Sequence, residues 1–322
     1  MSKKIAICIH AYNEELFISE TIESILSQTF SDFDLIISDN HSTDNTAKII
    51  RHYQSKDSRV ILWMPDAFCQ GMVHGRIITD RLNSMDYDAT IIIGAHDVIL
   101  PNYVELLHTA YLENPSAAIV VGRGFEIDTS GNPLRQWPDV IQLKGGHVSS
   151  RPLAILSTLF YNLPAFGLWP KKTRTNVNFR HNCVCGDHLY IAEASLHGDI
   201  IVEKNAIIKT RRTFGVGDHS TFFKKHISDD VQIDTVVADF EKQMEWICHI
   251  NGLAYAGFPE VTKDIILAGT LGIWFSLYGI TGLKGVDGAL EKWLASSSGL
   301  TVASQMSSIG SAARLNSLLA RP

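Results

Sequence analysis

The sequence predicts an α/β fold built on an open, mostly parallel sheet that is doubly wound with helices. Through the first 125 residues, short unbroken runs rich in Ile and Val alternate with segments whose apolar residues recur at helical spacing. Continuous apolar strands are typical of a parallel sheet buried on both faces. Right-handed crossovers then place helices on both sides of such a sheet.

The elements of this sheet can be assigned in chain order. Strands are predicted over Ile5–Ile9, Leu35–Ser38, Val60–Trp63, Ala89–Gly94 and Ala117–Val121. The helices between and after them are predicted over Glu14–Gln28, Thr43–Tyr53, Gly71–Leu82 and Pro101–Glu113. No internal repeat interrupts this alternation.

The pattern changes after Gly122. Residues 125–182 are irregular and rich in Gly, Pro, Trp and Arg, which is typical of a functional loop region. A helix is predicted over Asp187–Leu196, strands follow at Ile200–Glu203 and Ala206–Lys209, and the chain looks mainly helical after about Thr235. We therefore expect a domain over residues 1–240, with halves 1–122 and 123–240, and a helical C-terminal region over 241–322.

Composition narrows the function classes. The chain has 322 residues, a formal net charge of −6 and 45% apolar residues, which excludes a disordered chain. The absence of a basic excess argues against nucleic-acid binding. Five cysteines without framework spacing indicate a reducing, cytoplasmic compartment. The apolar run near the N-terminus is too short for a signal peptide.

The ends of the predicted strands carry the candidate ligand-binding residues. Open α/β sheets bind ligands beyond the carboxyl ends of their strands, and three of these ends are polar: residues 10–14, 38–44 and 94–97. Neither a GxGxxG loop after the first strand nor a GxxxxGK[ST] loop is present, which disfavours a dinucleotide fold or a P-loop. A nucleotide would need other partners.

Asp39 and Tyr12 are the candidates for that task. Asp39 could accept a hydrogen bond from a base N–H or a ribose hydroxyl, and Tyr12 could stack on a base or simply pack. Ser42 or Asp44 suits the N-terminal cap of the following helix, which would explain that pair without any ligand.

Asp97 and Asp187 are the other two acids of interest. A carboxylate at a strand end suits a divalent cation that bridges phosphate oxygens, although Asp97 could equally begin the next helix. His96 could be a second ligand, which would favour manganese over magnesium, or a neutral hydrogen-bonded histidine. Asp187 could cap its helix or act as a general base. The Cys-x-Cys spacing of residues 183 and 185 is unusual for zinc.

With these residues the chain closely resembles the family 2 glycosyltransferases, which have the GT-A fold. The segments that carry the resemblance are Ala11-Tyr12-Asn13-Glu14-Glu15, residues 21–30, residues 34–39, residues 42–46, Gly71 with Arg76, residues 97–101, and more weakly Gly167-Leu168-Trp169, then Gly186-Asp187 through Gly198. They cover roughly two thirds of the chain. The C-terminal third matches nothing that we would name.

The resemblance implies a role for each of these positions. Ala11, Tyr12, Asn13 and Glu14, with Asp39, would hold the base and ribose of a nucleoside-diphosphate sugar, and Arg76 and His96 would face the same donor. Asp97 corresponds to the last carboxylate of the metal-binding Asp-x-Asp signature, which implies Mn²⁺ or Mg²⁺. Asp187 corresponds to the catalytic base of inverting members. The implied enzyme is a hexosyltransferase with a glycan or glycolipid acceptor, and residues 125–182 would form the acceptor site.

Four positions depart from the family pattern. His10 replaces the usual proline and Gly186 replaces the Glu before Asp187. In the metal signature, Gly94 replaces the leading carboxylate and His96 stands where a second Asp is common. These changes leave open a catalytically silent relative that binds nucleotide sugars. A sugar-phosphate nucleotidyltransferase is disfavoured, because it should have a Gly-rich loop with a basic residue after the first strand.

Several further assignments stay open from the sequence. Arg211 or Arg212 could meet the donor diphosphate or be solvated, and residues 211–223 could form a lid. Trp137, Phe160, Tyr161 and Trp169 could stack on sugars or form a small core. Residues 265–283 are uncharged but include four glycines, so a buried helix, an interfacial or oligomer-forming helix and a membrane span all remain. Peripheral contact with the inner face of the membrane is one expectation, and a homo-oligomer formed by these helices is another.

Overall fold

The computed structural model describes residues 5–145, 151–152, 155, 162–177 and 186–213. The chain divides into two compact units. Unit 1 comprises residues 1–145, 163–181 and 197–213, and unit 2 comprises residues 146–162, 182–196 and 214–322. The predicted domain boundary at residue 240 lies outside the described residues.

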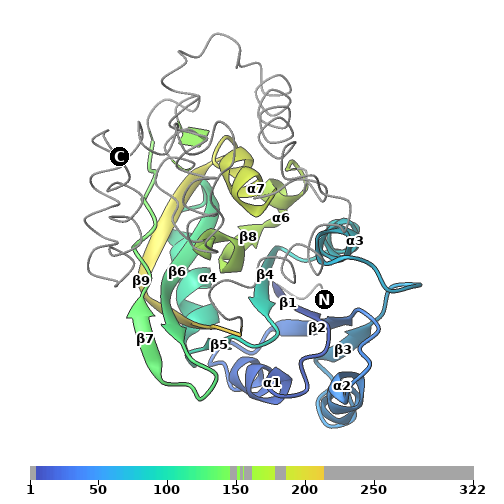
Figure 1. Ribbon diagram of the computed structural model, residues 1–322. Helices are drawn as coiled ribbons and strands as arrows, with labels where there is room; N and C mark the ends of the chain where they lie inside the picture. Colours follow the sequence, from blue (N-terminus) through green and yellow to red (C-terminus); the bar gives the residue numbers. More distant parts are fainter. Residues whose placement is uncertain (1–4, 146–150, 153–154, 156–161, 178–185, 214–322) are drawn as a thin grey trace, which may run out of the picture. The chain divides into compact units, whose positions relative to one another are not determined.

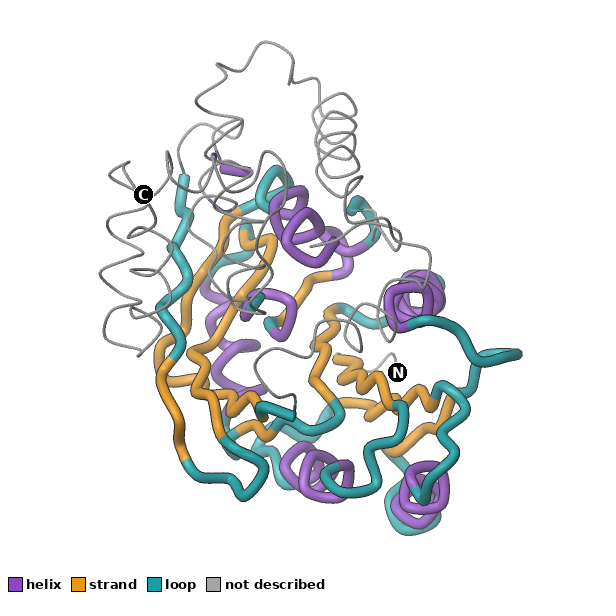
Figure 2. Tube along the Cα trace, in the orientation of Figure 1, coloured by secondary structure: helices purple, strands orange, loops and turns teal. Residues whose placement is uncertain are grey.

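Nine strands of the described part of unit 1 form one sheet (Figures 1 and 2). They are β1 (Ile5–Ala11), β2 (Phe33–Asp39), β3 (Val60–Trp63), β4 (Ala89–Gly94), β5 (Val98–Ile99), β6 (Ala117–Ile127), β7 (Pro133–Gln136), β8 (Leu168–Pro170) and β9 (Asp199–Arg211). Their order is β3-β2-β1-β4-β8-β6-β9-β5, and β7 pairs with β6. The first five predicted strands are therefore confirmed.

The first half of the sheet is parallel, as the sequence predicts. Strands β3, β2, β1 and β4 pair side by side in the same direction, with Ala11 opposite Asp39 and His10 opposite Gly94. The chain order reverses between β1 and β4, since β2 and β3 extend the sheet one way and β4 lies on the other side. Such a switch point is where an open α/β sheet binds its ligand.

The second half of the sheet is mixed. Strand β8 is antiparallel to both β4 and β6, and β5 is antiparallel to β9. Strand β9 is one continuous strand parallel to β6, whereas the sequence predicted two runs broken near Asn205. The register shifts between Val121 and Arg123 of β6, which pair with Val202 and Ile207 of β9. The irregularity that the sequence suggests near Asn205 is therefore a bulge within β9 and not a break between two strands. The segment from residue 125 onward is thus less irregular than predicted, because β6, β7 and β8 all use it.

Three helices enclose the parallel half. Helices α1 (Ile18–Leu26) and α2 (Thr46–Gln54) lie on one side of the sheet and α3 (Gly71–Asn83) on the other (Figure 1). Buried residues on the α3 side come from four strands or their ends and from the helix itself: Ala6, Cys8, Ile36, Trp63, Ile78, Leu82 and Tyr87. Burial of apolar surface on both faces explains the continuous Ile runs in the sequence.

Local structure at the helix starts differs from the prediction. Helix α1 begins at Ile18 rather than Glu14, because residues 15–17 form a turn in which the Glu14 carbonyl accepts from the Phe17 and Ile18 amides. Two shorter helices, η2 (Leu163–Phe166) and α6 (Lys171–Arg174), flank β8, and α4 (Tyr103–Glu113) precedes β6.

Unit 2 contributes one described helix, α7 (Gly186–Ala194), which was predicted. None of the helices in the described part of the chain is long and apolar enough to cross a membrane. Residues 265–283, Cys183, Cys185 and the proposed lid beyond Thr213 lie outside the described residues.

Candidate functional site

The switch-point edge of unit 1 brings two predicted loops together. Asn13, with φ 55°, accepts a hydrogen bond from the Thr43 amide at 2.8 Å, and its own amide donates to Ser42 Oγ at 2.9 Å. The Glu14 amide donates to Thr46 Oγ1 at 2.8 Å. These side-chain hydrogen bonds join the loop after β1 to the loop after β2. They hold together the sheet edge at which the sequence predicts a bound nucleotide sugar.

Asp39 ends β2 beneath these loops and is 0% exposed. Its Oδ1 accepts from both the amide and the hydroxyl of Ser42, so Ser42 orients the carboxylate rather than capping a helix. Asp44 takes the helix-starting role, since its Oδ1 accepts from the Thr46 amide. Asp39 Oδ2 is buried and has no hydrogen-bond partner among the described residues. A buried acceptor of this kind is costly unless a ligand donor satisfies it.

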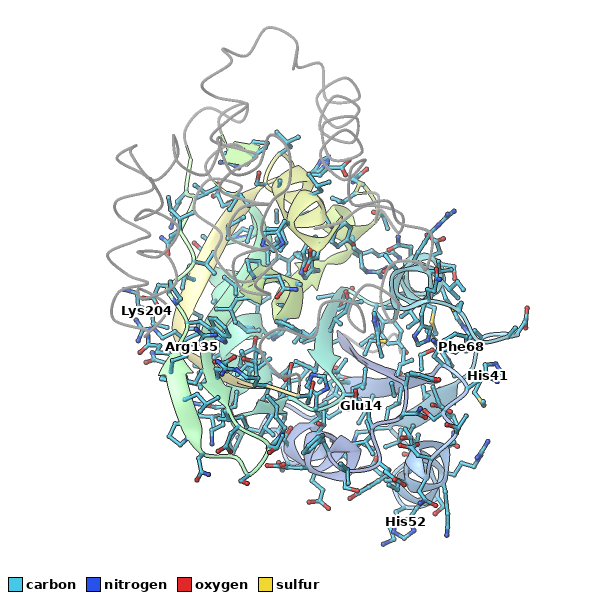
Figure 3. All side chains as sticks on the ribbon, viewed as in Figure 1. Glu14, His41, His52, Phe68, Arg135 and Lys204 are labelled. Atoms are coloured by element: carbon cyan, nitrogen blue, oxygen red, sulfur yellow. The ribbon has the colours of Figure 1, made fainter. Side chains whose placement is uncertain are left out.

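Tyr12 lies beside an aromatic residue that sequence reasoning did not single out. The rings of Tyr12 and Phe68 are 5.0 Å apart between centroids, at an interplanar angle of 49°. Phe68 belongs to the loop before α3 and its residue surface is 55% exposed (Figure 3). A lone phenylalanine among small and polar residues was the available signal in the sequence, but only the fold brings it to Tyr12.

Asp97 follows β4 and is almost fully buried, with 3% of its surface exposed. Its Oδ1 accepts from the backbone amide of Arg211 at 2.8 Å. Burial raises the pKa of this carboxyl above its ordinary value and outweighs the opposing influence of His96 and of the Arg211 amide. Ionisation of this carboxyl is therefore less favourable in the folded protein than in water.

Gly94 has a steric reason to lack a side chain. A Cβ at this position would come within 2.5 Å of Asp97 Oδ2, because the Asp97 carboxylate folds back over the end of β4. The leading carboxylate of the family signature would compete for the same space. The loss of that carboxylate and the inward turn of Asp97 therefore belong to one local arrangement.

The side chain of His96 interacts with the carboxylate of Glu14. Its Nδ1 lies 3.2 Å from both carboxylate oxygens of Glu14, whose side chain is 12% exposed. This contact joins the loop after β4 to the loop after β1. Two of the predicted donor-binding residues are thus brought together across the switch point.

A divalent cation at this edge would have to take part of its ligands from a bound substrate. Within the described residues, no group of three or more His, Cys, Asp or Glu side chains is arranged to hold a metal ion. Mg²⁺ often uses only one or two carboxylates together with substrate phosphates. Asp97, whose ionised form burial disfavours, is the carboxylate that a nearby cation would help to ionise.

Arg211 is a structural residue and not a free phosphate ligand. Its side chain is 2% exposed and donates to the carbonyls of His96, Asp128 and Thr129 and to Glu20. The predicted alternatives, contact with a diphosphate or full solvation, are therefore both wrong for this side chain. Arg212 is half-buried and bonded to both oxygens of Glu126.

Arg76 lies on α3 with its side chain 49% exposed and its Nε 3.4 Å from Asp80. The two tryptophans of the predicted acceptor region are core residues, each 3% exposed. Trp137 donates to Thr210 Oγ1 and Trp169 donates to the Pro164 carbonyl. Phe160 and Tyr161 lie outside the described residues.

Asp187 belongs to unit 2, in the first turn of α7. Its Oδ2 accepts from Asn162 Nδ2 and its Oδ1 lies 3.1 Å from His188 Nδ1. Burial opposes ionisation, but His188 and the hydrogen bonds from His188 and Asn162 outweigh it and lower the pKa of the carboxyl. The side chain keeps 28% exposure, so an ionised carboxylate remains accessible.

Known proteins of one family resemble this chain over the sheet that carries the site. Residues 6–160 match the model of the family described as Glycosyl transferase family 2. Over this range, about half of its length, the chain is similar to the family 2 glycosyltransferases. The matched range includes β1 to β7 and therefore every strand end of the switch-point edge.

Individual relatives match over shorter or more distant stretches. An uncharacterised glycosyltransferase of Methanocaldococcus jannaschii is 28% identical over 135 residues, which are 41% of this chain and 46% of that protein. The Escherichia coli enzyme UDP-Glc:alpha-D-GlcNAc-diphosphoundecaprenol beta-1,3-glucosyltransferase WfaP is 42% identical over 72 residues, 22% of this chain and 28% of that protein. The first of these matches, like that to GlyG of Streptococcus pneumoniae, spans less than half of the relative's length.

A solved structure shows the same fold. The crystal structure of S. aureus TarS 1–349 in complex with UDP-GlcNAc superposes with a TM-score of 0.61 at 18% identity, covering 90% of this chain and 80% of that one. The predicted GT-A fold, a mixed α/β sheet with helices, is confirmed.

Proposed function

We propose that this chain transfers a sugar, most simply a hexose, from a nucleoside-diphosphate sugar to a hydroxyl of a glycan or glycolipid acceptor with inversion at the anomeric carbon. The observation that carries the proposal is the buried Asp39, whose Oδ2 has no partner among the described residues at the switch-point edge. A nucleoside supplies the N–H and O–H donors that this oxygen needs. Similarity to the family supplies the reaction class.

The donor is proposed to be UDP-linked. One relative is named for UDP-Glc and a structural neighbour was solved with UDP-GlcNAc. The same relative's name describes a diphosphoundecaprenol acceptor, which favours a lipid-linked glycan here and peripheral contact with the cytoplasmic face of the membrane. In this proposal Ala11, Tyr12, Asn13, Glu14 and Asp39 hold the nucleoside, and Arg76 and His96 face the donor.

Asp187 is the proposed general base. Its pKa is held below the ordinary carboxyl value, so it is ionised and accepts the proton of the acceptor hydroxyl as that oxygen attacks the anomeric carbon. The new C–O bond forms as the bond to the diphosphate oxygen breaks, and the nucleoside diphosphate leaves with the electron pair. His188 and Asn162 orient the carboxylate. A divalent cation, Mn²⁺ or Mg²⁺, held at Asp97 would offset charge on the diphosphate.

The test is nucleoside-diphosphate release from UDP-, GDP- and dTDP-sugars, with Mn²⁺, with Mg²⁺ or with EDTA, and with lipid-linked glycans as acceptors. We expect Asp187→Asn to lower the rate constant by about a hundred- to ten-thousandfold with UDP affinity unchanged. Asp86→Asn, at an exposed surface carboxylate, is the matched control. Undiminished turnover in Asp187→Asn would remove the base assignment. Tight donor binding with no turnover under any condition would instead favour a catalytically silent relative.

A further inference from the structure

The loop before α3 presents Phe68 in a way that packing alone does not explain. Phe68 is one of the most exposed large apolar residues in the described part of the chain, yet its ring contacts Tyr12 at 5.0 Å between centroids. Exposed aromatic surface is unfavourable in water and marks binding sites when it adjoins one. Tyr12 is the residue that faces the nucleoside in the proposed function, and Phe68 extends its apolar surface.

The position of Phe68 is fixed by two residues of the loop after β2. Asn40, 3% exposed, donates through Nδ2 to the Cys69 carbonyl at 2.6 Å and accepts at Oδ1 from the Cys69 amide at 3.1 Å. His41 Nε2 lies 2.9 Å from the Pro65 carbonyl. The loop that carries Phe68 is therefore held on both sides of Phe68, and His41 and Phe68 lie in the same part of the molecule (Figure 3).

His41 adopts this place at a conformational cost. Its φ is 59°, in the left-handed region that residues with a Cβ rarely adopt. Strained residues persist where the surrounding structure holds them, and they cluster at ligand sites. The strain lies in a residue that holds the Phe68 loop.

The ring geometry limits how a ligand can use this pair. A planar base between two parallel rings needs their planes about 7 Å apart, twice an ordinary contact distance. The rings of Tyr12 and Phe68 touch at 49°, so they form one bent surface rather than a slot. A base can lie against such a surface while its edge remains available to Asp39.

We propose that Phe68 and Tyr12 form a two-ring wall against which the donor's nucleobase stacks, and that Asn40 and His41 are positioning residues for Phe68. The proposal rests on the proposed function and adds the residues that recognise the base. Stacking on a π-face is tolerant of base identity. The wall therefore provides affinity for any nucleoside, and selection among bases falls to the hydrogen bonds at its edge.

The experiment measures binding of UDP, UMP and inorganic pyrophosphate by calorimetry to the full chain and its variants. We expect Phe68→Ala to weaken UDP and UMP roughly tenfold, the lower part of what base–aromatic stacking contributes, and to leave pyrophosphate unchanged. Phe68→Trp should keep the affinity and Phe68→Leu should not. Leu112→Ala, at an apolar residue of α4 that is at least as exposed as Phe68, is the control and should change nothing.

The positioning role is tested through non-additivity. Asn40→Asp keeps the acceptor but loses the Nδ2 donor, so it should weaken UDP as Phe68→Ala does, and the double variant should lose little more. Unaltered UDP affinity in Phe68→Ala, or full affinity in Phe68→Leu, would overturn the stacking wall. Additive losses in the double variant would overturn the role of Asn40. If the wild type binds none of UDP, GDP and dTDP, the proposed function itself fails, and this inference with it.

Discussion

Asp39 and Asp97 are both buried carboxylates at the ends of strands in the parallel half of the sheet, yet the protein treats them differently. Asp39 is oriented by Ser42, three residues away, and keeps one oxygen without a partner among the described residues. Asp97 is held by the amide of Arg211, 114 residues away, and burial raises its pKa.

The difference shows how each residue depends on the rest of the fold. The orientation of Asp39 is a local property of the turn after β2. Its buried Oδ2 would be satisfied by a hydrogen-bond donor from a ligand. The orientation of Asp97 depends on the end of β9 lying against the loop after β4, and burial disfavours its ionised form. We therefore expect changes at the Asp39 edge to affect nucleoside binding, and changes at the Asp97 edge to affect turnover and stability.

The largest expected effect separates the two carboxylates by their readouts. Asp97→Asn should lower sugar transfer about a thousandfold, because several kcal/mol of charge stabilisation at the diphosphate would be lost. Asp39→Asn should instead weaken UDP binding, roughly tenfold, because an unsatisfied donor replaces an acceptor. Steady-state kinetics and calorimetry on both variants measure this. Equal losses of UDP affinity in the two variants would mean that both carboxylates act on the same part of the donor.

Arg211→Ala should destabilise the loops that the Arg211 side chain joins, while its backbone amide can still donate to Asp97. The change leaves three carbonyls and Glu20 without their donor. We therefore expect the free energy of unfolding, measured by urea denaturation, to be about 3 kcal/mol lower than in the wild type. Arg212→Ala, at a half-exposed side chain whose partner Glu126 also contacts Arg135, should lose only about 1 kcal/mol. A loss in Arg211→Ala no greater than in this control would show that the buried hydrogen bonds contribute little.

The smallest effect concerns pH. Because the pKa of Asp97 is raised in the folded protein, its protonated form favours folding, and that contribution is lost as the pH rises through the carboxyl range. An asparagine side chain in its place carries no charge at any pH. We therefore expect Asp97→Asn to stabilise the ligand-free protein by about 1 kcal/mol at neutral pH, and by progressively less as the pH falls. Thermal unfolding between pH 4 and pH 8 tests this, and destabilisation at neutral pH would contradict it.

The two edges also differ in how far the sequence predicts them. The loops at residues 10–14 and 38–44 are predicted as one site because short-range strand patterns place their ends together, and the register of Ala11 opposite Asp39 confirms that proximity. The sequence leaves the cap open between Ser42 and Asp44, since both residue types suit that role. Only the fold shows that Ser42 donates to the Asp39 carboxylate, whereas Asp44 accepts from the first amide of helix α2.

Residues far apart in the chain are the hardest to predict. The sequence allows Arg211 to be a surface or phosphate-binding arginine, but the pairing of β9 with β6 and β5 buries it against the loops at residues 96 and 128–129. Phe68 carries no motif, and its contact with Tyr12 depends on Asn40 and His41 holding the intervening loop.

The sequence by itself determined the strands of the parallel half, its apolar core and the identity of the acids at the strand ends, because these follow from short-range periodicity and residue chemistry. Tertiary structure decided the burial and the hydrogen-bond partners of each acid. Burial raises the pKa of Asp97, and a hydrogen bond from the amide of Arg211, more than a hundred residues away, holds its carboxylate. Burial also leaves Asp39 Oδ2 without a partner among the described residues. Those quantities depend on neighbours in space, which no local pattern encodes.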